Sequence, residues 1–349
     1  MGGPSQQVDV LLVKLGSTPG LRRADEQLTA ALVRAGARVA AVESARPRDV
    51  RTLMLTDLQW ARAARRAAQR QLESMERLPH ATLYSTTTAA LLWPLPGAIR
   101  FDAPAAANRP GRHGLWQRTL ERRRLRQASL LLPWSEGGLA EACAAVPGCA
   151  DRALVLSAPI ELACETSGEQ PQSPAERDIA AITYASNPSK KGFDRVLAAW
   201  RRVRRAGERL VVVGIGRVEL SAAGFEVPDV DVELTGSIAG PELRGLLRRA
   251  RVFICAPRRE DYGLVQLEAL AEGCLLVTSP APGPYVALAM AHELDPRLVS
   301  EDLGAALREA LDKPVTDYRA RAAQLLEPYG QVTFDRLVAE QLLPRLLRG

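Results

Sequence analysis

Short apolar runs alternate with longer amphipathic segments along this chain, and the alternation starts twice. The first series opens with an apolar run at residues 8–13, a helical stretch at about 22–35 and a second apolar run at 39–42. A strand, a helix and a second strand in this order are typical of a parallel, doubly wound sheet, so an α/β fold is predicted. The series continues with a helix expected at 57–78 and strands expected near Leu83, 99–101, 130–132 and 154–156.

A polar stretch separates the two series. Residues 165–176 are polar, carry Ser, Gly and Gln and include two prolines, which is typical of an interdomain linker. At 349 residues the chain is long enough for two hydrophobic cores. We therefore predict an N-terminal domain at 1–164, the linker at 165–176 and a C-terminal domain at 177–325. In the second domain we expect strands at 179–185, 210–213 and 232–234 and helices at 192–206 and 241–250.

Composition narrows the class of protein. Hydrophobic residues make up 47% of the chain and charged residues 25%, as in an ordinary globular protein. No stretch is typical of a membrane span or a secretory signal. The 5 cysteines have no CxxC spacing, which fits a reducing cytoplasm and gives no signal of a metal site or a disulfide. We therefore expect a cytoplasmic protein without a bound metal.

Basic residues are concentrated in the first half of the chain. Two predicted helices carry arginine clusters there, Arg62, Arg65, Arg66 and Arg70 in one and Arg122, Arg123, Arg124 and Arg126 in the other. A basic helix can dock on an anionic membrane surface, but in this arginine-rich chain a solvated helix face is the preferred interpretation of such clusters. No nucleic-acid-binding module accompanies the clusters, and we expect no nucleic-acid partner. Lysine is rare, which draws attention to Lys190 and Lys191.

Two glutamates near residue 260 stand in unusual places. Glu260 follows the apolar run 252–256 and therefore lies in a loop beyond the carboxyl end of a strand, where open α/β sheets bind ligands. Glu268 falls on the apolar stripe of the next helix, which should face the core. A carboxylate in such a place requires hydrogen-bond donors, and sugar or ribose hydroxyls can supply them.

Glycine pairs follow two of the predicted strands. Gly214 and Gly216 lack the third glycine of a dinucleotide-binding fingerprint, since Glu219 occupies that position, so we predict a turn that ends a strand. Gly16 and Gly20 follow the first strand, where a loop can approach a diphosphate, although ordinary turn chemistry accounts for them as well.

Over about residues 179–311 the chain resembles the retaining glycosyltransferases of family 4, the group 1 glycosyl transferases. The family's hallmark is a Glu-x7-Glu run in the context P-x-x-E-x-F/Y-G-L. The chain matches this context at Pro257, Glu260, Tyr262, Gly263, Leu264 and Glu268. Upstream segments occur in the family's order: a helix opened by Lys191-Gly192, a Gly-rich turn at 213–216 and a loop at 234–238.

The resemblance implies the GT-B fold, in which two Rossmann-like domains face each other across a cleft. The C-terminal domain would bind a nucleotide-diphosphate sugar and the N-terminal domain an acceptor, and residues 326–349 would cross back as a helix to the N-terminal domain. By position, Glu260 would contact the donor sugar hydroxyls, Glu268 the ribose hydroxyls and Lys191 the diphosphate.

The resemblance also assigns roles to residues around these three. The backbone amides of Tyr262, Gly263 and Leu264 would face the sugar and phosphate at the N-terminus of a helix, where the helix dipole favours anions. Ile238 would lie beside the nucleobase.

Among the chain's departures from the family pattern, two concern candidate site residues. Ser186 and Ala185 occupy the positions where an arginine commonly precedes the diphosphate lysine, so either Lys190 compensates or the phosphate is bound less tightly. Asp102 stands where the family often has a histidine, and the nearest histidine is His113. Both flank a Pro/Gly-rich loop, and we regard them as candidates to polarise the acceptor hydroxyl or to bond the reacting sugar.

These observations predict a hexosyltransferase-type enzyme of glycan biosynthesis that acts with retention of configuration, without metal or cofactor. The co-substrate would be a nucleotide-diphosphate sugar and the acceptor a glycan, a lipid-linked molecule or a small molecule. The enzyme would be cytoplasmic, with peripheral contact at the inner membrane face through the basic first domain. Two alternatives stay open: a nucleotide-sugar epimerase on the same fold, and a non-catalytic subunit that binds a nucleotide sugar.

Overall fold

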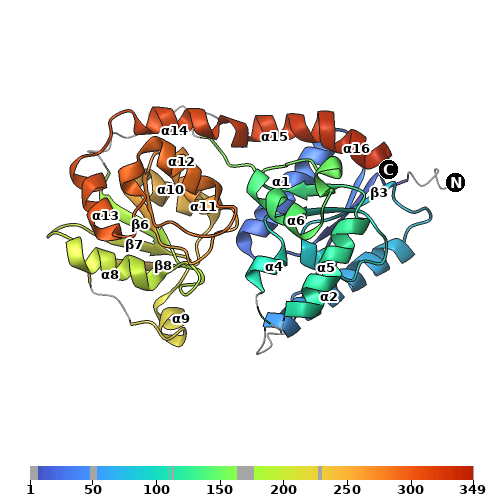
Figure 1. The fold of residues 1–349 in the computed structure, drawn as a ribbon, viewed down its shortest axis with the longest axis horizontal. Helices are drawn as coiled ribbons and strands as arrows, with labels where there is room; N and C mark the ends of the chain where they lie inside the picture. The colour runs from blue at the N-terminus through green and yellow to red at the C-terminus, as the bar shows by residue number, and fades with distance from the viewer. Residues whose placement is uncertain are drawn as a thin grey trace. The chain divides into compact units, whose positions relative to one another are not determined.

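A computed structural model describes residues 7–47, 53–109, 111, 114–162, 177–226 and 230–348, with Leu53, Met54 and Ala107 described by their backbone alone. The chain divides into two compact units (Figure 1). Unit 1 comprises Met1–Pro159 and Gln331–Gly349, and unit 2 comprises Ile160–Gly330. The last segment of the chain thus belongs to the same unit as the first. The predicted linker at 165–176 lies outside the described residues.

Unit 1 is built on a five-stranded parallel sheet in the order β2-β1-β3-β4-β5. Its strands are β1 (Val10–Lys14), β2 (Val39–Glu43), β3 (Ala81–Tyr84), β4 (Ala98–Phe101) and β5 (Leu131–Pro133). The first four residues of β1 are completely buried, as expected for a central parallel strand that is covered on both faces.

Helices cover both faces of this sheet. The first helix, α1 (Pro19–Arg34), begins slightly before the expected position because Thr18 Oγ1 accepts a hydrogen bond from Leu21 N and Pro19 occupies the first turn. The other helices are α2 (Leu53–Glu73), α3 (Thr87–Ala90), α4 (Ala105–Asn108), α5 (Leu115–Gln127), α6 (Glu136–Ala145), the 3₁₀ turn η2 (Cys149–Arg152), α15 (Gln331–Leu337), the π-helical turn η6 (Val338–Leu342) and α16 (Leu343–Arg348).

Alternate residues of β1 pack into two different hydrophobic clusters. Leu11 and Val13 belong to a cluster completed by α2, α3 and α5, whereas Val10 and Leu12 belong to a cluster completed by α1. The second cluster also contains side chains from the end of the chain, namely Phe334, Val338, Leu342 and Leu346. The last helical segment therefore contributes one apolar stripe to the core of unit 1.

Unit 2 contains a second five-stranded parallel sheet, in the order β10-β9-β6-β7-β8. Its strands are β6 (Ile179–Tyr184), β7 (Leu210–Val213), β8 (Val232–Gly236), β9 (Ala250–Cys255) and β10 (Leu275–Thr278). The hydrophobic runs that predicted β7 and β9 are buried almost completely.

The strands of unit 2 are connected by helices, as the sequence predicted (Figure 1). The helix α8 (Phe193–Val203) buries Phe193, Val196, Leu197 and Trp200, one apolar face of a strongly amphipathic segment. The others are α9 (Arg217–Ala222), α10 (Gly240–Arg249), α11 (Leu264–Ala271), α12 (Val286–Leu294), the 3₁₀ turn η4 (Pro296–Leu298), α13 (Leu303–Asp312), α14 (Tyr318–Leu326) and the 3₁₀ turn η5 (Glu327–Tyr329). Two α/β units with parallel sheets confirm the predicted fold class.

Two expected elements differ in the structure. The strand expected at 154–156 is absent: the backbone there donates hydrogen bonds to Leu131 O and Pro133 O, but only Ala153 forms a bridge to β5. The helix expected to reach residue 78 ends at Glu73, where Ser74 Oγ donates a hydrogen bond of 2.8 Å to Gln71 O and so caps the last turn.

The structure also contains a disulfide that the cysteine spacing did not predict. It joins Cys143 in α6 to Cys149 in η2, with a Cα–Cα distance of 5.4 Å. The turn between them includes Gly148 with φ of 75°, a left-handed conformation that brings the chain back on itself. Spacing alone cannot reveal such a pair, because its proximity depends on this turn.

Candidate functional site

The strand order of unit 2 creates a switch point at the carboxyl edge of its sheet. The chain runs from β6 to β7 and β8 on one side of β6, and then returns to β9 and β10 on the other side. The loops after β6 and β9 therefore diverge, and open α/β sheets bind their ligands at such a point. Lys191 lies in the loop after β6, and Glu260 lies in the loop after β9.

Lys191 and Glu260 form an ion pair at this switch point. Lys191 Nζ donates a hydrogen bond of 2.6 Å to Glu260 Oε2, and Gln266 Nε2 donates another of 3.1 Å to the same oxygen. The Lys191 side chain is 27% exposed and that of Glu260 11%, so the charges interact in a partly dehydrated environment. The structure thus brings together a cation and a carboxylate that were predicted for one ligand. Gln266 was not predicted, although it lies inside the motif.

Close backbone contacts fix the two loops. Gly192 has φ of 61°, and a Cβ atom there would lie 1.9 Å from the carbonyl oxygen of Ala256. Gly283 has φ of 110°, and a Cβ atom there would lie 2.2 Å from the carbonyl oxygen of Glu260. Any larger residue at either position would displace the loops, so glycine at both places sets where Lys191 and Glu260 stand.

The loop after β9 leads directly into α11. Gly263 is the N-cap of this helix and makes no side-chain capping bond, so the first turn presents backbone N–H groups to a ligand at the switch point. Tyr262, just before it, is 3% exposed, and its carbonyl accepts a hydrogen bond of 3.2 Å from Val286 N. Glu268 lies on the same helix and is 6% exposed, which confirms that this carboxylate faces inward.

A buried polar group lies under the start of α11. Tyr285 packs its ring against Gly263, and its hydroxyl lies 3.4 Å from Cys255 Sγ and 3.3 Å from Thr278 Oγ1. Burial raises the pKa of Tyr285 well above its ordinary value and also raises the pKa of Cys255. Both groups therefore stay protonated and hold the loop in place, rather than acting as a base or a nucleophile.

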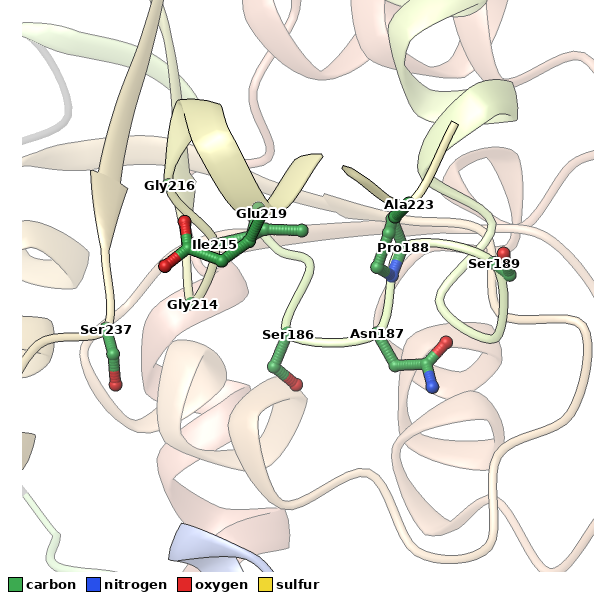
Figure 2. Close-up of a pocket in the computed structure, with 10 residues that line it drawn as sticks. All are labelled: Ser186, Asn187, Pro188, Ser189, Gly214, Ile215, Gly216, Glu219, Ala223 and Ser237. Carbon is green, nitrogen blue, oxygen red and sulfur yellow. The ribbon is translucent and has the colours of Figure 1, made fainter. Parts of the chain in front are cut away.

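A pocket of about 490 Å³ opens beside the ion pair (Figure 2). Three loops at the carboxyl edge of the sheet line it: 186–189 after β6, 214–216 after β7 and Ser237 after β8. Glu219 and Ala223 complete the lining. The first loop continues into Lys190 and Lys191, so one loop contributes to both the pocket and the ion pair. Its volume is within the range of small-molecule sites, about 300–1,000 Å³.

The sequence carried one signal of this pocket. Ser186 lines it at a position where the resemblance would place an arginine, and the smaller side chain leaves space. Lys190, expected to compensate, is exposed, and its backbone N–H binds Asn187 Oδ1 at 3.0 Å. Ile238 follows Ser237 directly and is half-buried. Gly214 ends β7 in a turn whose N–H binds Gly236 O at 2.8 Å, as predicted for a strand-ending turn.

Unit 1 has a switch point of its own, between β1 and β3. Gly16 lies in the loop after β1, and its carbonyl accepts a hydrogen bond of 2.9 Å from Arg22 Nη1. Leu15 N donates a bond of 3.1 Å to Ser85 Oγ in the loop after β3, so the two loops are tied together. Gly16 thus stands at a carboxyl edge, where a ligand could be approached.

The other candidates of unit 1 follow β4. Asp102 is half-buried, and its Oδ1 accepts a hydrogen bond of 2.8 Å from Ala103 N. The short helix α4 behind it is fixed by Glu121, whose carboxylate oxygens accept bonds of 2.9 and 3.0 Å from Ala105 N. Burial raises the pKa of Glu121. His113 lies outside the described residues.

All but one of the arginines in the two clusters are exposed. The arginines of α2 are exposed, whereas Arg124 of α5 lies 5.0 Å from the ring centroid of Trp93 and donates to Leu91 O at 2.9 Å. The helices of the described part of the chain include none that is sufficiently long and apolar to cross a membrane. The same residues contain no group of three or more His, Cys, Asp or Glu side chains arranged to hold a metal ion.

Known proteins resemble this chain most clearly in unit 2. Residues 177–317 match the model of the family described as glycosyl transferases group 1. Glycogen synthase of Mycobacterium tuberculosis strain H37Rv is 34% identical over 144 residues, which are 39% of this chain and 34% of that protein. The GDP-mannose:cellobiosyl-diphosphopolyprenol alpha-mannosyltransferase of Xanthomonas oryzae pv. oryzae is 36% identical over 58 residues, 17% of this chain and 15% of that protein. The chain thus matches about a third or less of the length of these curated relatives.

Solved structures match nearly the whole chain. WaaG, a glycosyltransferase involved in lipopolysaccharide biosynthesis, aligns with a TM-score of 0.68 at 16% identity and covers 95% of this chain and 98% of that one. The Anabaena protein HepE in complex with UDP and glucose aligns with a TM-score of 0.64 at 14% identity, covering 97% and 99%. Sucrose-phosphate synthase from Thermosynechococcus elongatus gives 0.61 at 16% identity, covering 94% and 99%. The chain therefore has the GT-B fold of these proteins, as the sequence predicted, and its residues 177–317 match the glycosyl transferases group 1 family.

Proposed function

We propose that this protein is a glycosyltransferase of the hexosyltransferase type. It transfers a sugar from a nucleotide-diphosphate sugar to an acceptor hydroxyl with retention of configuration, and it uses neither a metal nor a cofactor. The observation that carries the proposal is the Lys191–Glu260 ion pair at the switch point of unit 2, next to the pocket at the ends of β6, β7 and β8. The family match and the UDP and glucose bound by a protein of the same fold support it.

The charges at the switch point suit a nucleotide-diphosphate sugar. Lys191 and the uncapped N-terminus of α11 both attract an anion, and the diphosphate is the anionic part of the donor. Glu260 accepts hydrogen bonds only, so sugar hydroxyls are its natural partners when Lys191 turns to the phosphate. Glu268, buried on α11, takes the ribose hydroxyls in the same proposal.

The reaction follows from these roles. The bond between the anomeric carbon and the diphosphate oxygen breaks, and its electron pair leaves with the nucleoside diphosphate. Lys191 and the N–H groups of α11 stabilise the charge that develops there, which is the task a metal performs in other transferases. The acceptor oxygen bonds to the anomeric carbon on the face that the leaving group vacates, and its proton passes to the departing phosphate oxygen.

Unit 1 binds the acceptor in this proposal. Asp102 hydrogen-bonds the acceptor hydroxyl or the reacting sugar, and Gly16 allows the loop after β1 to approach the diphosphate. The exposed arginines of α2 place a lipid-linked acceptor at an anionic membrane surface, on the cytoplasmic side where nucleotide sugars are made. Glycans and small molecules are the other acceptor classes that the assay must include.

A panel of nucleotide-diphosphate sugars tests the proposal. One of them should raise the Tm of the full chain, and release of nucleoside diphosphate in the presence of an acceptor extract should depend on it. Lys191→Met should abolish both effects, because the cation at the diphosphate is lost. The matched control is Lys313→Met, since this lysine is 72% exposed and forms an ion pair with Glu309, one helical turn before it. A panel that never shifts the Tm, or an epimerised donor in place of a transferred sugar, would overturn the proposal.

A further inference from the structure

Among the described residues that line the pocket beside the ion pair, one side chain is charged. Its lining consists of serine and asparagine side chains, glycine backbone, three apolar side chains and the carboxylate of Glu219. No cation is present among these lining residues, so the pocket does not suit the diphosphate of the donor. It suits a neutral group that donates hydrogen bonds to a carboxylate.

The order of the strands assigns this pocket to one end of the donor. Along the sheet, Glu260 follows β9, Lys191 follows β6, and the pocket extends from the loop after β6 to those after β7 and β8. If the sugar lies at Glu260 and the diphosphate at Lys191, the nucleoside continues in the same direction and reaches the pocket. The step from the sugar to the far loop, after β8, covers three strand spacings, about 14 Å at roughly 4.8 Å each.

The carboxylate of Glu219 lies on the side of this pocket that is opposite to Asn187 and Ser189 (Figure 2). It is the third residue of α9 and is exposed, and its Oε2 lies over the backbone of Gly216 at the end of the turn after β7. Figure 2 shows the carboxylate turned toward the side of the pocket where Ser237 lies, with Asn187 and Ser189 at the opposite side. Both carboxylate oxygens can therefore meet the edge of a nucleobase.

The hydrogen-bonding edges of the bases differ in what they offer to such a group. Guanine presents two neighbouring N–H donors, N1–H and the 2-amino group, which match the two oxygens of a carboxylate. Uracil and thymine present a single N–H between two carbonyl oxygens, and those oxygens are repelled by the carboxylate. Adenine and cytosine each place a ring-nitrogen acceptor beside their amino group, which leaves one carboxylate oxygen opposite a lone pair.

We propose that Glu219 is a specificity-determining residue that selects a guanosine diphosphate donor. The inference rests on the proposed function, because it uses Lys191 as the diphosphate site to orient the nucleotide. A bidentate, charge-assisted contact that is partly open to solvent should favour GDP over UDP by roughly 10- to 100-fold in Kd. Inosine diphosphate lacks the 2-amino group and should bind with intermediate affinity.

Binding of GDP, IDP, UDP and ADP to the full chain tests this selectivity by titration calorimetry. Glu219→Gln keeps the size of the side chain and its capacity to support the first turn of α9, but its amide NH₂ opposes one guanine donor. It should weaken GDP binding at least about tenfold while leaving UDP binding equal or tighter. Glu301→Gln removes an exposed carboxylate that pairs with Arg195 and does not line the pocket, so it should leave the ranking unchanged.

The outcomes separate this inference from the proposed function. If the nucleotides bind in a way that Lys191→Met abolishes, but GDP has no advantage or Glu219→Gln does not reduce it, the base selection is wrong and the function stands. If no nucleotide binds, or if binding is indifferent to Lys191→Met, both fail. A loss of GDP binding that comes with a lower Tm of the Glu219→Gln protein would assign Glu219 to α9 stability and overturn base selection.

Discussion

In the Lys191–Glu260 ion pair, Glu260 occupies the cation that a phosphate would bind. Substitutions of the two residues should therefore change the affinity for a nucleoside diphosphate in opposite directions. Glu260 Oε2 accepts a hydrogen bond of 2.6 Å from Lys191 Nζ. A phosphate that binds Lys191 must replace this carboxylate. Glu260→Gln should therefore strengthen the binding of a free nucleoside diphosphate, whereas Lys191→Met should weaken it. If the ion pair had only a structural role, both substitutions would change the affinity for the nucleoside diphosphate in the same direction.

The magnitude follows from the contact and its exposure. A hydrogen bond between charged groups contributes about 1.5–3 kcal/mol. The lower value applies here because Lys191 is 27% exposed and recovers water when it is released. About 1.5 kcal/mol corresponds to roughly tenfold in a dissociation constant, so Glu260→Gln should tighten the Kd of the nucleoside diphosphate by up to about tenfold. Sugar transfer should fall at least about tenfold in the same variant, since the hydroxyls of the donor sugar lose the carboxylate that accepts their hydrogen bonds.

Titration calorimetry with the nucleoside diphosphate and turnover with the nucleotide sugar measure the two effects separately. Gln266→Leu serves as a second variant, because Gln266 donates to the same Glu260 oxygen at 3.1 Å without carrying charge. It should loosen Glu260 and reduce turnover while leaving the Kd of the diphosphate nearly unchanged. Weaker diphosphate binding in Glu260→Gln would refute the competition between Glu260 and phosphate.

Three further predictions concern stability and loop geometry. Burial raises the pKa of Asp25 from 3.8 to about 6. Between these pH values the folded chain therefore binds more protons than the unfolded chain, and the free energy of unfolding falls as the pH rises through this range. The free energy of unfolding, measured by urea denaturation, should fall by about 3 kcal/mol between about pH 4 and about pH 7, and Asp25→Asn should remove this pH dependence. If the pH dependence persists in the variant, another group causes it. Gly192→Ala should lower the Tm and weaken nucleotide binding because its Cβ would lie 1.9 Å from a carbonyl oxygen; Gly207→Ala, with φ of 82° and no atom within 4 Å, should leave binding intact. Phe334→Ala should lower the free energy of unfolding by about 3–5 kcal/mol. Val332→Ala, at a 72% exposed position, should change it little, and equal effects would contradict the place of the last helix in the core of unit 1.

The periodicity of apolar residues was sufficient to predict the sheets. Runs such as 210–213 and 252–255 are apolar at every position, which is the pattern of strands buried on both faces, and both form central or near-central strands. The run at 154–156 has the same composition but lies at the sheet edge, where it makes two hydrogen bonds to β5 and no continuous ladder. The apolar composition of a segment predicts that it is buried, but it does not predict how many neighbouring strands it pairs with.

The site was predictable where a residue type is unusual for its place. Glu260 and Glu268 stood out because carboxylates rarely occur beside a buried strand or on an apolar stripe. Gln266 and Glu219 did not, since polar residues are ordinary on helices and their directions depend on the tertiary fold. Asp25 was missed for the same reason: its burial on α1, 3.9 Å from Arg100 Nη1, is fixed by the sheet beneath it.

The departure at Ser186 connects the two halves of the candidate site. An arginine at this position would place a cation on the wall of the pocket, in the same loop as Lys191. With serine there, the Glu219 carboxylate is the only charge among the described residues of the pocket lining, and the attraction for a diphosphate is concentrated on Lys191 and the N-terminus of α11. Ser186→Arg should therefore tighten the binding of inorganic pyrophosphate and, by neutralising Glu219, reduce the preference of the protein for GDP over UDP. Titrations of the three ligands decide this, and a GDP preference that survives Ser186→Arg would show that the carboxylate of Glu219 is not what selects the base.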